Sequence, residues 1–172
     1  MTQVWDSMGF NSLHLATYKN SFEIVKILAD YMTDQFKRSS QSIQSSDSVS
    51  SSEKLILWIM QAMPGDEGFT CVHYAAFNGN LTILRYFFLK GISLQRLFRR
   101  FKVSLFHAAA QGDQPGALAF LKEQLQRETY GRCSDFESMR DHNNSTPLHW
   151  ACTKDSINCI QFLIAWDFDI DA

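Results

Sequence analysis

A fourfold internal repeat constrains this chain more than any other feature of its sequence. Four histidines (14, 73, 107 and 149) each follow a Ser, Thr or Asn by three residues and precede an alanine by two. About ten residues beyond each histidine an apolar pattern typical of a second helix begins. One such helix pair cannot bury its apolar face alone, so the pairs must stack. The sequence therefore predicts an all-α repeat solenoid of about four helix-turn-helix units.

Individual residues of the repeat have identifiable structural roles. Thr146 is placed to cap the first helix of the fourth unit, and a proline follows where a missing N–H costs nothing. Asn20 and Gly79 stand at the turn between the two helices of a unit, where a left-handed backbone is expected. Asp155 departs from this rule in the fourth unit. In the third unit the glycine is displaced by one position, to Gly112, so we predict an irregular turn there.

The fourth unit, Thr146-Pro-Leu-His-Trp-Ala-Cys152, resembles the T-P-L-H-x-A core of ankyrin repeats. The resemblance covers about residues 6–38 and 66–172 and implies a protein-binding scaffold. The recurrent histidine also suggests a metal or acid-base site. However, no second ligand type recurs beside it, and equivalent positions in a stack lie about one repeat apart. We therefore predict that each imidazole is a buried hydrogen-bond bridge, and we expect no metal and no cofactor.

The spacing of the histidines indicates where the repeat is interrupted. The intervals are 59, 34 and 42 residues, against about 33 in an uninterrupted array. We place the repeats at about 6–38, 66–95, 102–128 and 141–172. Residues 39–52 include nine serines and are predicted to form a disordered loop, because they cannot bury enough apolar area to become ordered. Residues 53–64 are predicted to form an inserted helix.

A basic and aromatic stretch lies between the second and third units. Its cationic residues form a possible basic patch made of Arg96, Arg99, Arg100 and Lys102. One interpretation is an amphipathic helix that turns Leu97, Phe98 and Phe101 inward and leaves the arginines in solvent. The alternative is a surface for an acidic protein or a lipid headgroup, ahead of nucleic acid. The formal charge of −2 gives no overall attraction to nucleic acid, and no nucleic-acid partner is predicted.

The sequence contains no recognisable catalytic motif. No nucleophile, base and orienting group can be assembled from its motifs, so the chain is not predicted to be an enzyme. The longest purely apolar run, Leu55–Met60, is far shorter than the roughly 18 residues of a membrane-spanning helix. The N-terminus lacks the positive start and apolar core of a secretory signal. We therefore expect a cytoplasmic location and no membrane span.

A closer resemblance concerns the third and fourth units. The segments His107–Pro115 and Ser145–Cys152 resemble the ankyrin region of some DHHC palmitoyltransferases. This resemblance implies the cytosolic regulatory or substrate-recruiting part of a membrane enzyme, although the chain contains no DHHC motif. The cytosolic repeat domain of an ion channel is a second alternative. Because the final residues match the last stretch of a repeat, adjoining repeats of a longer parent chain are expected.

The expected partner is another protein, bound on the concave surface of the stack. Residues that hold the stack together are unavailable, whereas positions beside the turn and at the end of each first helix face the concave side. The candidate partner-binding residues are Phe10, Tyr18, Lys19, Phe69, Phe77, Asn78, Gln111, Ser145, Thr153 and Lys154. Aromatic residues are enriched where interfaces concentrate their energy, so Phe10, Phe69 and Phe77 are the predicted anchors. The alternative is that Phe69 and Phe77 pack under the loop at Pro64.

Overall fold

A computed structural model describes residues 10–41, 49–62, 69–101, 103–129 and 139–166 of the chain. The described residues form helices joined by turns, with one isolated β-bridge between Ala62 and Thr70. The helices are α1 (Ser12–Tyr18), α2 (Phe22–Gln41), α3 (Ser51–Ile59), α4 (Cys71–Phe77), α5 (Leu81–Leu89), α6 (Leu94–Phe101), α7 (Leu105–Gln111), α8 (Pro115–Thr129), α9 (Pro147–Thr153) and α10 (Ile157–Ile164). Within the described residues, no helix is both long enough and apolar enough to cross a bilayer.

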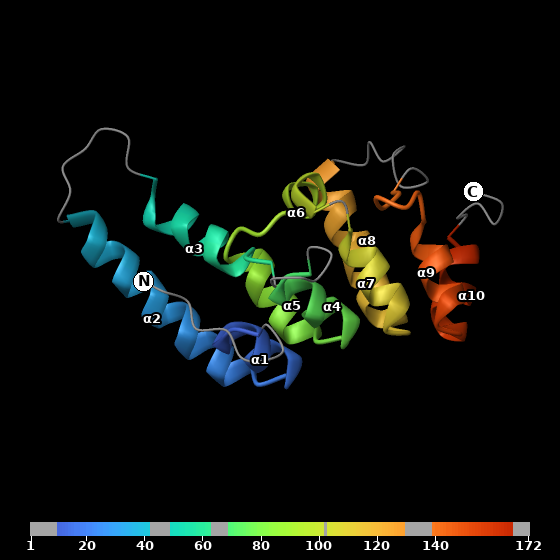
Figure 1. Cartoon of the computed structure of the whole chain (residues 1–172), viewed down its shortest axis with the longest axis horizontal. Helices are drawn as coiled ribbons and strands as arrows, with labels where there is room; N and C mark the ends of the chain where they lie inside the picture. Colours follow the sequence, from blue (N-terminus) through green and yellow to red (C-terminus); the bar gives the residue numbers. More distant parts are fainter. Residues whose placement is uncertain (1–9, 42–48, 63–68, 102, 130–138, 167–172) are drawn as a thin grey trace.

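Eight of these helices form two rows that run along the molecule (Figure 1). The first helices of the four pairs, α1, α4, α7 and α9, pack side by side in one row. The second helices, α2, α5, α8 and α10, form the other row. Helices α3 and α6 stand outside this pattern, and they pack on α2 and α8 respectively. The predicted all-α repeat solenoid is thus the observed fold.

In α4 and α7 the repeated histidine caps its own helix and ties it to the next pair, whereas His149 of α9 is exposed, so the prediction of a buried bridge is wrong for that residue. In α4, α7 and α9 the preceding Thr or Ser accepts a hydrogen bond from a backbone N–H of the first turn, and its own backbone N–H donates to Nδ1 of the histidine. Nε2 of His73 lies 3.0 Å from the carbonyl oxygen of Val103, and Nε2 of His107 lies 3.0 Å from that of Ser145. These two imidazoles are therefore the buried bridges between repeats that the sequence predicted.

All four turns between paired helices place a residue in the left-handed region. The residues are Asn20 (φ 55°), Gly79 (φ 67°), Asp113 (φ 51°) and Asp155 (φ 55°), each six positions beyond the repeated histidine. The prediction of an irregular third turn is therefore wrong, because Asp113 takes the left-handed position there. Asp and Asn adopt this conformation more readily than most other side chains. Asp155 likewise follows the common geometry in the fourth unit.

Gly112 serves close packing rather than the turn. It caps α7 with an ordinary φ of −85°. A Cβ added to Gly112 would lie 1.9 Å from the carbonyl oxygen of Phe77 and 2.8 Å from its carbonyl carbon. The other units carry Lys19, Asn78 and Lys154 at the equivalent position. The absence of a side chain at Gly112 thus allows α7 to approach the end of α4.

The inserted segments lengthen helices of the stack. Helix α2 continues to Gln41 and α3 begins at Ser51, so both ends of the predicted serine-rich loop (39–52) are helical. Residues 42–48 lie outside the described residues. Helix α3 ends at Ile59, earlier than the predicted 64, and buries Leu55, Ile56 and Ile59. In the third unit α8 runs on to Thr129, which accounts for much of the wide interval between the third and fourth histidines.

Candidate protein-interaction surface

An aromatic band crosses the row of first helices. We define it by five residues, namely Phe10, Tyr18, Tyr74, Phe69 and Trp150. Ring centroids are 5.8 Å apart for Phe10 and Tyr18, 5.4 Å for Phe10 and Tyr74, and 6.0 Å for Tyr18 and Tyr74. Phe69 continues the band, 5.7 Å from Tyr74 and 6.2 Å from Trp150. The band therefore joins the first two units to the fourth.

Phe69 is buried, with 7% of its surface exposed, so the expectation that it faces solvent is wrong. Its ring stacks on Trp150, with an angle of 10° between the ring planes. The position equivalent to Trp150 in the intervening third unit is Ala108, which is fully buried. Because Ala108 carries only a methyl group, the larger rings on either side can meet across α7. Phe69 thus contributes to the fold of the stack.

Trp150 is held in place by Asp141. The indole N–H of Trp150 donates to Asp141 at 2.8 Å, and the backbone N–H groups of Asn143 and Ser145 donate to the same carboxylate at 2.8 Å each. Burial acts to raise the pKa of Asp141, but these hydrogen bonds prevail and hold it below its ordinary value. An ionised Asp141 therefore fixes both the loop before α9 and the orientation of the Trp150 ring.

The exposed part of the band lies at the first two units. Tyr18 is 44% exposed and Phe10 is partly buried. Lys19 is exposed, and its ammonium lies 5.7 Å from the centre of the Tyr18 ring. The side-chain amide of Asn78 donates to the carbonyl oxygen of Tyr18 at 3.2 Å, while Phe77 is partly buried against the core. The structure thus brings Phe10, Lys19 and Asn78 close to Tyr18, whereas Phe77 packs against the core.

The other candidates are spread along the same row of helices. Gln111 and Ser145 are partly buried, and their carbonyl oxygens accept hydrogen bonds from Ser156 and His107. Thr153 and Lys154 are exposed at the end of α9, in the last pair. These two residues therefore lie at the opposite end of the row from Phe10 and Tyr18.

Helix α6 has the form of an amphipathic helix. Leu94 and Leu97 are buried, and Phe98 and Phe101 are partly buried. The carboxylate of Glu128 caps the helix, because it accepts hydrogen bonds from the hydroxyl of Ser93 and from the backbone N–H groups of residues 94 and 95. The inward face of α6 is therefore apolar, as the first interpretation of the sequence requires.

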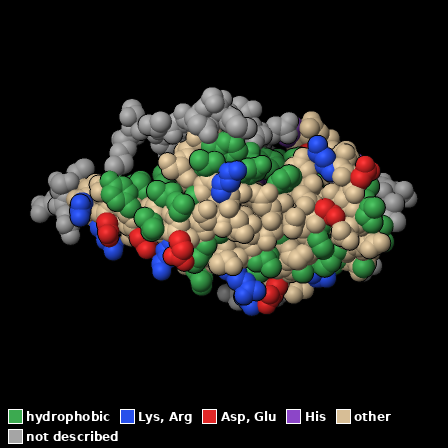
Figure 2. Space-filling view, turned by 90° about the horizontal axis from the view of Figure 1, so that it is seen from below, with side chains coloured by type: hydrophobic (Ala, Val, Ile, Leu, Met, Phe, Trp, Pro, Cys, Tyr) green, Lys and Arg blue, Asp and Glu red, His purple; other side chains and the backbone are tan. Residues whose placement is uncertain are grey.

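The predicted basic patch is smaller in the structure than in the sequence. Arg96 is partly buried and donates to Glu53 of α3, and this hydrogen bond lowers the pKa of Glu53. Arg99 and Arg100 are exposed, while Lys102 lies outside the described residues. Figure 2 shows the side of the molecule that is seen from below in Figure 1, away from α6, and there basic, acidic and hydrophobic side chains are interspersed.

The repeated histidines are engaged in structural hydrogen bonds rather than gathered at one site. Burial lowers the pKa of His107 to about 4, although its hydrogen bond to Ser145 and the nearby Asp141 act in the opposite direction. Among the described residues, no group of three His, Cys, Asp or Glu side chains is arranged to hold a metal ion.

Sequence reasoning missed Tyr74, Trp150 and Asp141. Tyr74 and Trp150 stand at the variable x of T-P-L-H-x-A, the same position as Leu15, which is 45% exposed, and Ala108. The residue type at this position differs from unit to unit, and its aromatic residues were a usable signal. Asp141 carried no comparable signal, since its contact with Trp150 depends on the loop geometry.

Comparison with known proteins agrees with this architecture. A family model described as ankyrin repeats, in three copies, matches residues 73–172. A transient receptor potential cation channel subfamily A member 1 homolog of Caenorhabditis elegans is 28% identical over 123 residues, which make up 68% of this chain and 10% of that protein. The chain therefore spans only a small part of the length of this relative.

A solved structure shares the fold. The ankyrin repeat domain of Bcl-3, described as a unique member of the IkappaB protein family, aligns with 95% of this chain and 60% of its own, with a TM-score of 0.55 and 21% identity. The predicted resemblance to ankyrin repeats is thereby confirmed. Since the family model also matches more than half of the residues, the chain belongs to the ankyrin-repeat family.

Proposed function

We propose that this protein-interaction module binds its partner protein on the row of first helices, and that the exposed part of the aromatic band is the centre of the contact. The observation that carries the proposal is the cluster of Phe10, Tyr18 and Tyr74 across two neighbouring repeats. Its outer member, Tyr18, exposes 44% of its surface. The proposed role is binding and not catalysis.

The physical basis is the energy that aromatic side chains contribute at interfaces. Tyrosine presents a large rigid surface with few rotatable bonds, so its ordering on binding costs little entropy. Lys19 and Asn78 beside Tyr18 supply hydrogen-bond donors at the rim. The alternative is that the cluster serves only to hold the first two repeats together. In that case the exposed edge of Tyr18 has no partner to contact.

Matched substitutions of two exposed tyrosines test the proposal. The partner is first recovered by affinity purification on the wild-type chain, identified by mass spectrometry and then purified. We expect Tyr18→Ser to weaken its binding about tenfold or more with little change in melting temperature. Tyr31→Ser is the control, since Tyr31 is 55% exposed on α2 in the row of second helices. Equal affinities for the two variants would contradict the proposal.

We further propose that the chain works as part of a longer protein, in contact with adjoining repeats. The similarity to the cation channel homolog of Caenorhabditis elegans supports this proposal, because the chain spans only 10% of that protein. The same similarity favours the cytosolic repeat domain of a cation channel as a second candidate function. The palmitoyltransferase alternative stays a prediction. The sequence of the full-length transcript separates them, because a channel has membrane spans without a DHHC segment. In either case the proposed location is the cytosolic side of a membrane, whereas a free-standing scaffold is cytoplasmic.

A further inference from the structure

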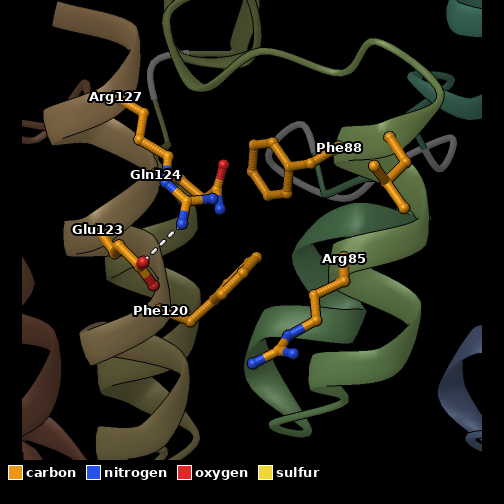
Figure 3. A pocket seen from close by; sticks show the side chains of 7 residues that line it. Arg85, Phe88, Phe120, Glu123, Gln124 and Arg127 are labelled. Carbon is orange, nitrogen blue, oxygen red and sulfur yellow. Dashed lines mark hydrogen bonds and ion pairs between the residues drawn. The ribbon is translucent and has the colours of Figure 1, made fainter. Parts of the chain in front are cut away.

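A pocket of about 450 Å³ lies between α5 and α8, in the row of second helices. Figure 3 shows Arg85 and Phe88 on α5 facing Phe120, Glu123 and Arg127 on α8. The aromatic band belongs to the first helices α1, α4 and α9 and to the residues just before them. The pocket is therefore a separate surface, and a ligand bound there would be additional to the partner proposed for the aromatic band.

The apolar part of the pocket is made by two phenylalanines and a leucine. The ring centroids of Phe88 and Phe120 are 5.7 Å apart in an edge-to-face arrangement. Leu89 is 86% exposed, which is the largest exposed fraction among the big hydrophobic side chains in the described residues. Phe88 is partly buried and Phe120 is 8% exposed, so the apolar surface that a ligand side chain could cover is mainly that of Leu89 and the exposed edge of Phe88.

The charged part of the pocket has an excess of positive charge. Arg127 pairs with Glu123 across 2.6 Å on the surface of α8 (Figure 3). The guanidinium of Arg85 lies 5.7 Å from the centre of the Phe120 ring, and it takes part in none of the ion pairs found among the described residues. Arg85 is thus an exposed cation that is held over an aromatic face and, within the part of the chain that the structure describes, lacks a carboxylate partner.

The wall of the pocket depends on the long helix of the third unit. Leu89, the last residue of α5, and Glu123 occupy equivalent positions of their repeats, but α8 continues from there to Thr129. Arg127 lies on this extension. The same insertion that widens the spacing of the histidines therefore supplies one side of the pocket.

We propose that this pocket is a second protein-binding site, which takes a peptide segment of a partner protein carrying one large apolar side chain and one carboxylate. The apolar side chain covers Leu89 and the exposed edge of Phe88. The carboxylate pairs with Arg85, whose guanidinium can bind it in a bidentate manner. Charge complementarity selects this occupant, because the only carboxylate among the described residues that line the pocket is already paired with Arg127.

The test uses short synthetic peptides in which one Leu and one Asp are placed at varied spacings in a Gly and Ser background. Binding to the whole chain is followed by NMR, with the methyl signals of Leu89 and the ring signals of Phe120 reporting the site. We expect at least one spacing to shift these signals. Replacing its Asp by Asn should weaken binding roughly twofold to fivefold, as for loss of the charge from a solvent-exposed ion pair. Replacing its Leu by Ser should abolish the shifts.

Variants of the chain assign the carboxylate to Arg85. With Arg85→Gln the Asp and Asn peptides should bind equally, and Arg85→Lys should restore part of the difference. Arg99→Gln is the matched control, because Arg99 is an exposed arginine on α6 and its loss should leave the preference for Asp intact. The Arg85 and Arg99 variants should also leave unchanged the affinity for the partner protein that is tested with Tyr18→Ser. Either proposal can therefore fail without the other.

Four outcomes would overturn the proposal. The first is that no peptide shifts the pocket signals at millimolar concentration, and the second is that the Asp preference survives Arg85→Gln. The third is sedimentation of the chain with phosphatidylserine vesicles in a manner that depends on Arg85, which would identify a membrane surface as the ligand. The fourth is a concentration-dependent shift of the Leu89 signals without peptide, which would identify a second copy of the chain.

Discussion

Gly112→Ala is the sharpest test of how the repeats pack. The backbone of Gly112 has an ordinary φ of −85°, so alanine meets no conformational barrier there. Judged from the backbone alone, the substitution should stabilise the protein by about 0.4–1 kcal/mol, because it reduces the entropy of the unfolded state. The structure predicts the opposite sign. The new Cβ would lie 1.9 Å from the carbonyl oxygen of Phe77, whereas real Cβ contacts are essentially never shorter than 3.0 Å.

The magnitude depends on which atoms have to move. The obstacle is the backbone of another helix, so no side-chain rotation relieves it, and α7 must shift from α4 by about 1 Å or more. The bridge from His73 to the carbonyl of Val103, 3.0 Å long, crosses the same interface and would be stretched. Insertions of this kind into packed interiors cost about 1–3 kcal/mol. We therefore expect Gly112→Ala to lower the free energy of unfolding by that amount.

Gly116→Ala is the matched control. Gly116 lies in the first turn of α8, and no atom lies within 4 Å of an added Cβ. There the helix propensity of alanine should raise the free energy of unfolding by up to about 1 kcal/mol. Urea denaturation followed by far-UV circular dichroism measures both variants. If Gly112→Ala is as stable as the wild type or more stable, the reasoning from close packing is refuted.

Two further predictions concern buried rings. Because Phe69 is 7% exposed, Phe69→Ala should lower the free energy of unfolding by about 3 kcal/mol, and an unchanged melting temperature would contradict its place in the stack. The pKa of His107, lowered to about 4 by burial, lies below its unfolded value of 6.5, so the unfolded chain takes up the proton first. Stability should therefore be complete above pH 6.5 and fall by roughly 3 kcal/mol as the pH drops to about 4. NMR titration of this imidazole tests the reasoning, which fails if the ring titrates near pH 6.5.

The local structure of the repeat could be predicted because it depends on residues close together in the chain. The caps at Thr70, Ser104 and Thr146 each join groups three residues apart, so their sequence spacing specifies the contact. The left-handed turn also follows from counting, since it stands six residues beyond each histidine. The error at the third turn arose because the displaced Gly112 was taken as the marker of the turn, although Asp113 at the expected position adopts the left-handed conformation.

The candidate surface could be predicted only in part. The concentration of candidates at the ends of the first helices followed from repeat positions, and the structure brings Phe10, Tyr18 and Asn78 close together there. The exposure of Phe69 could not be predicted, because it depends on Trp150, which lies two units further along the chain. A pattern within one repeat does not specify what a neighbour two repeats away will cover.

The sequence by itself determined the helix pairs, their caps and the stacking of the pairs, since these follow from short-range spacing and from an apolar face that must be buried. The tertiary structure decided which aromatic rings are buried, why Gly112 cannot carry a side chain, and where Arg85 meets Phe120. The physical reason is that these features depend on how closely one repeat approaches the next. That distance is set jointly by side chains far apart in the sequence, and no single segment encodes it.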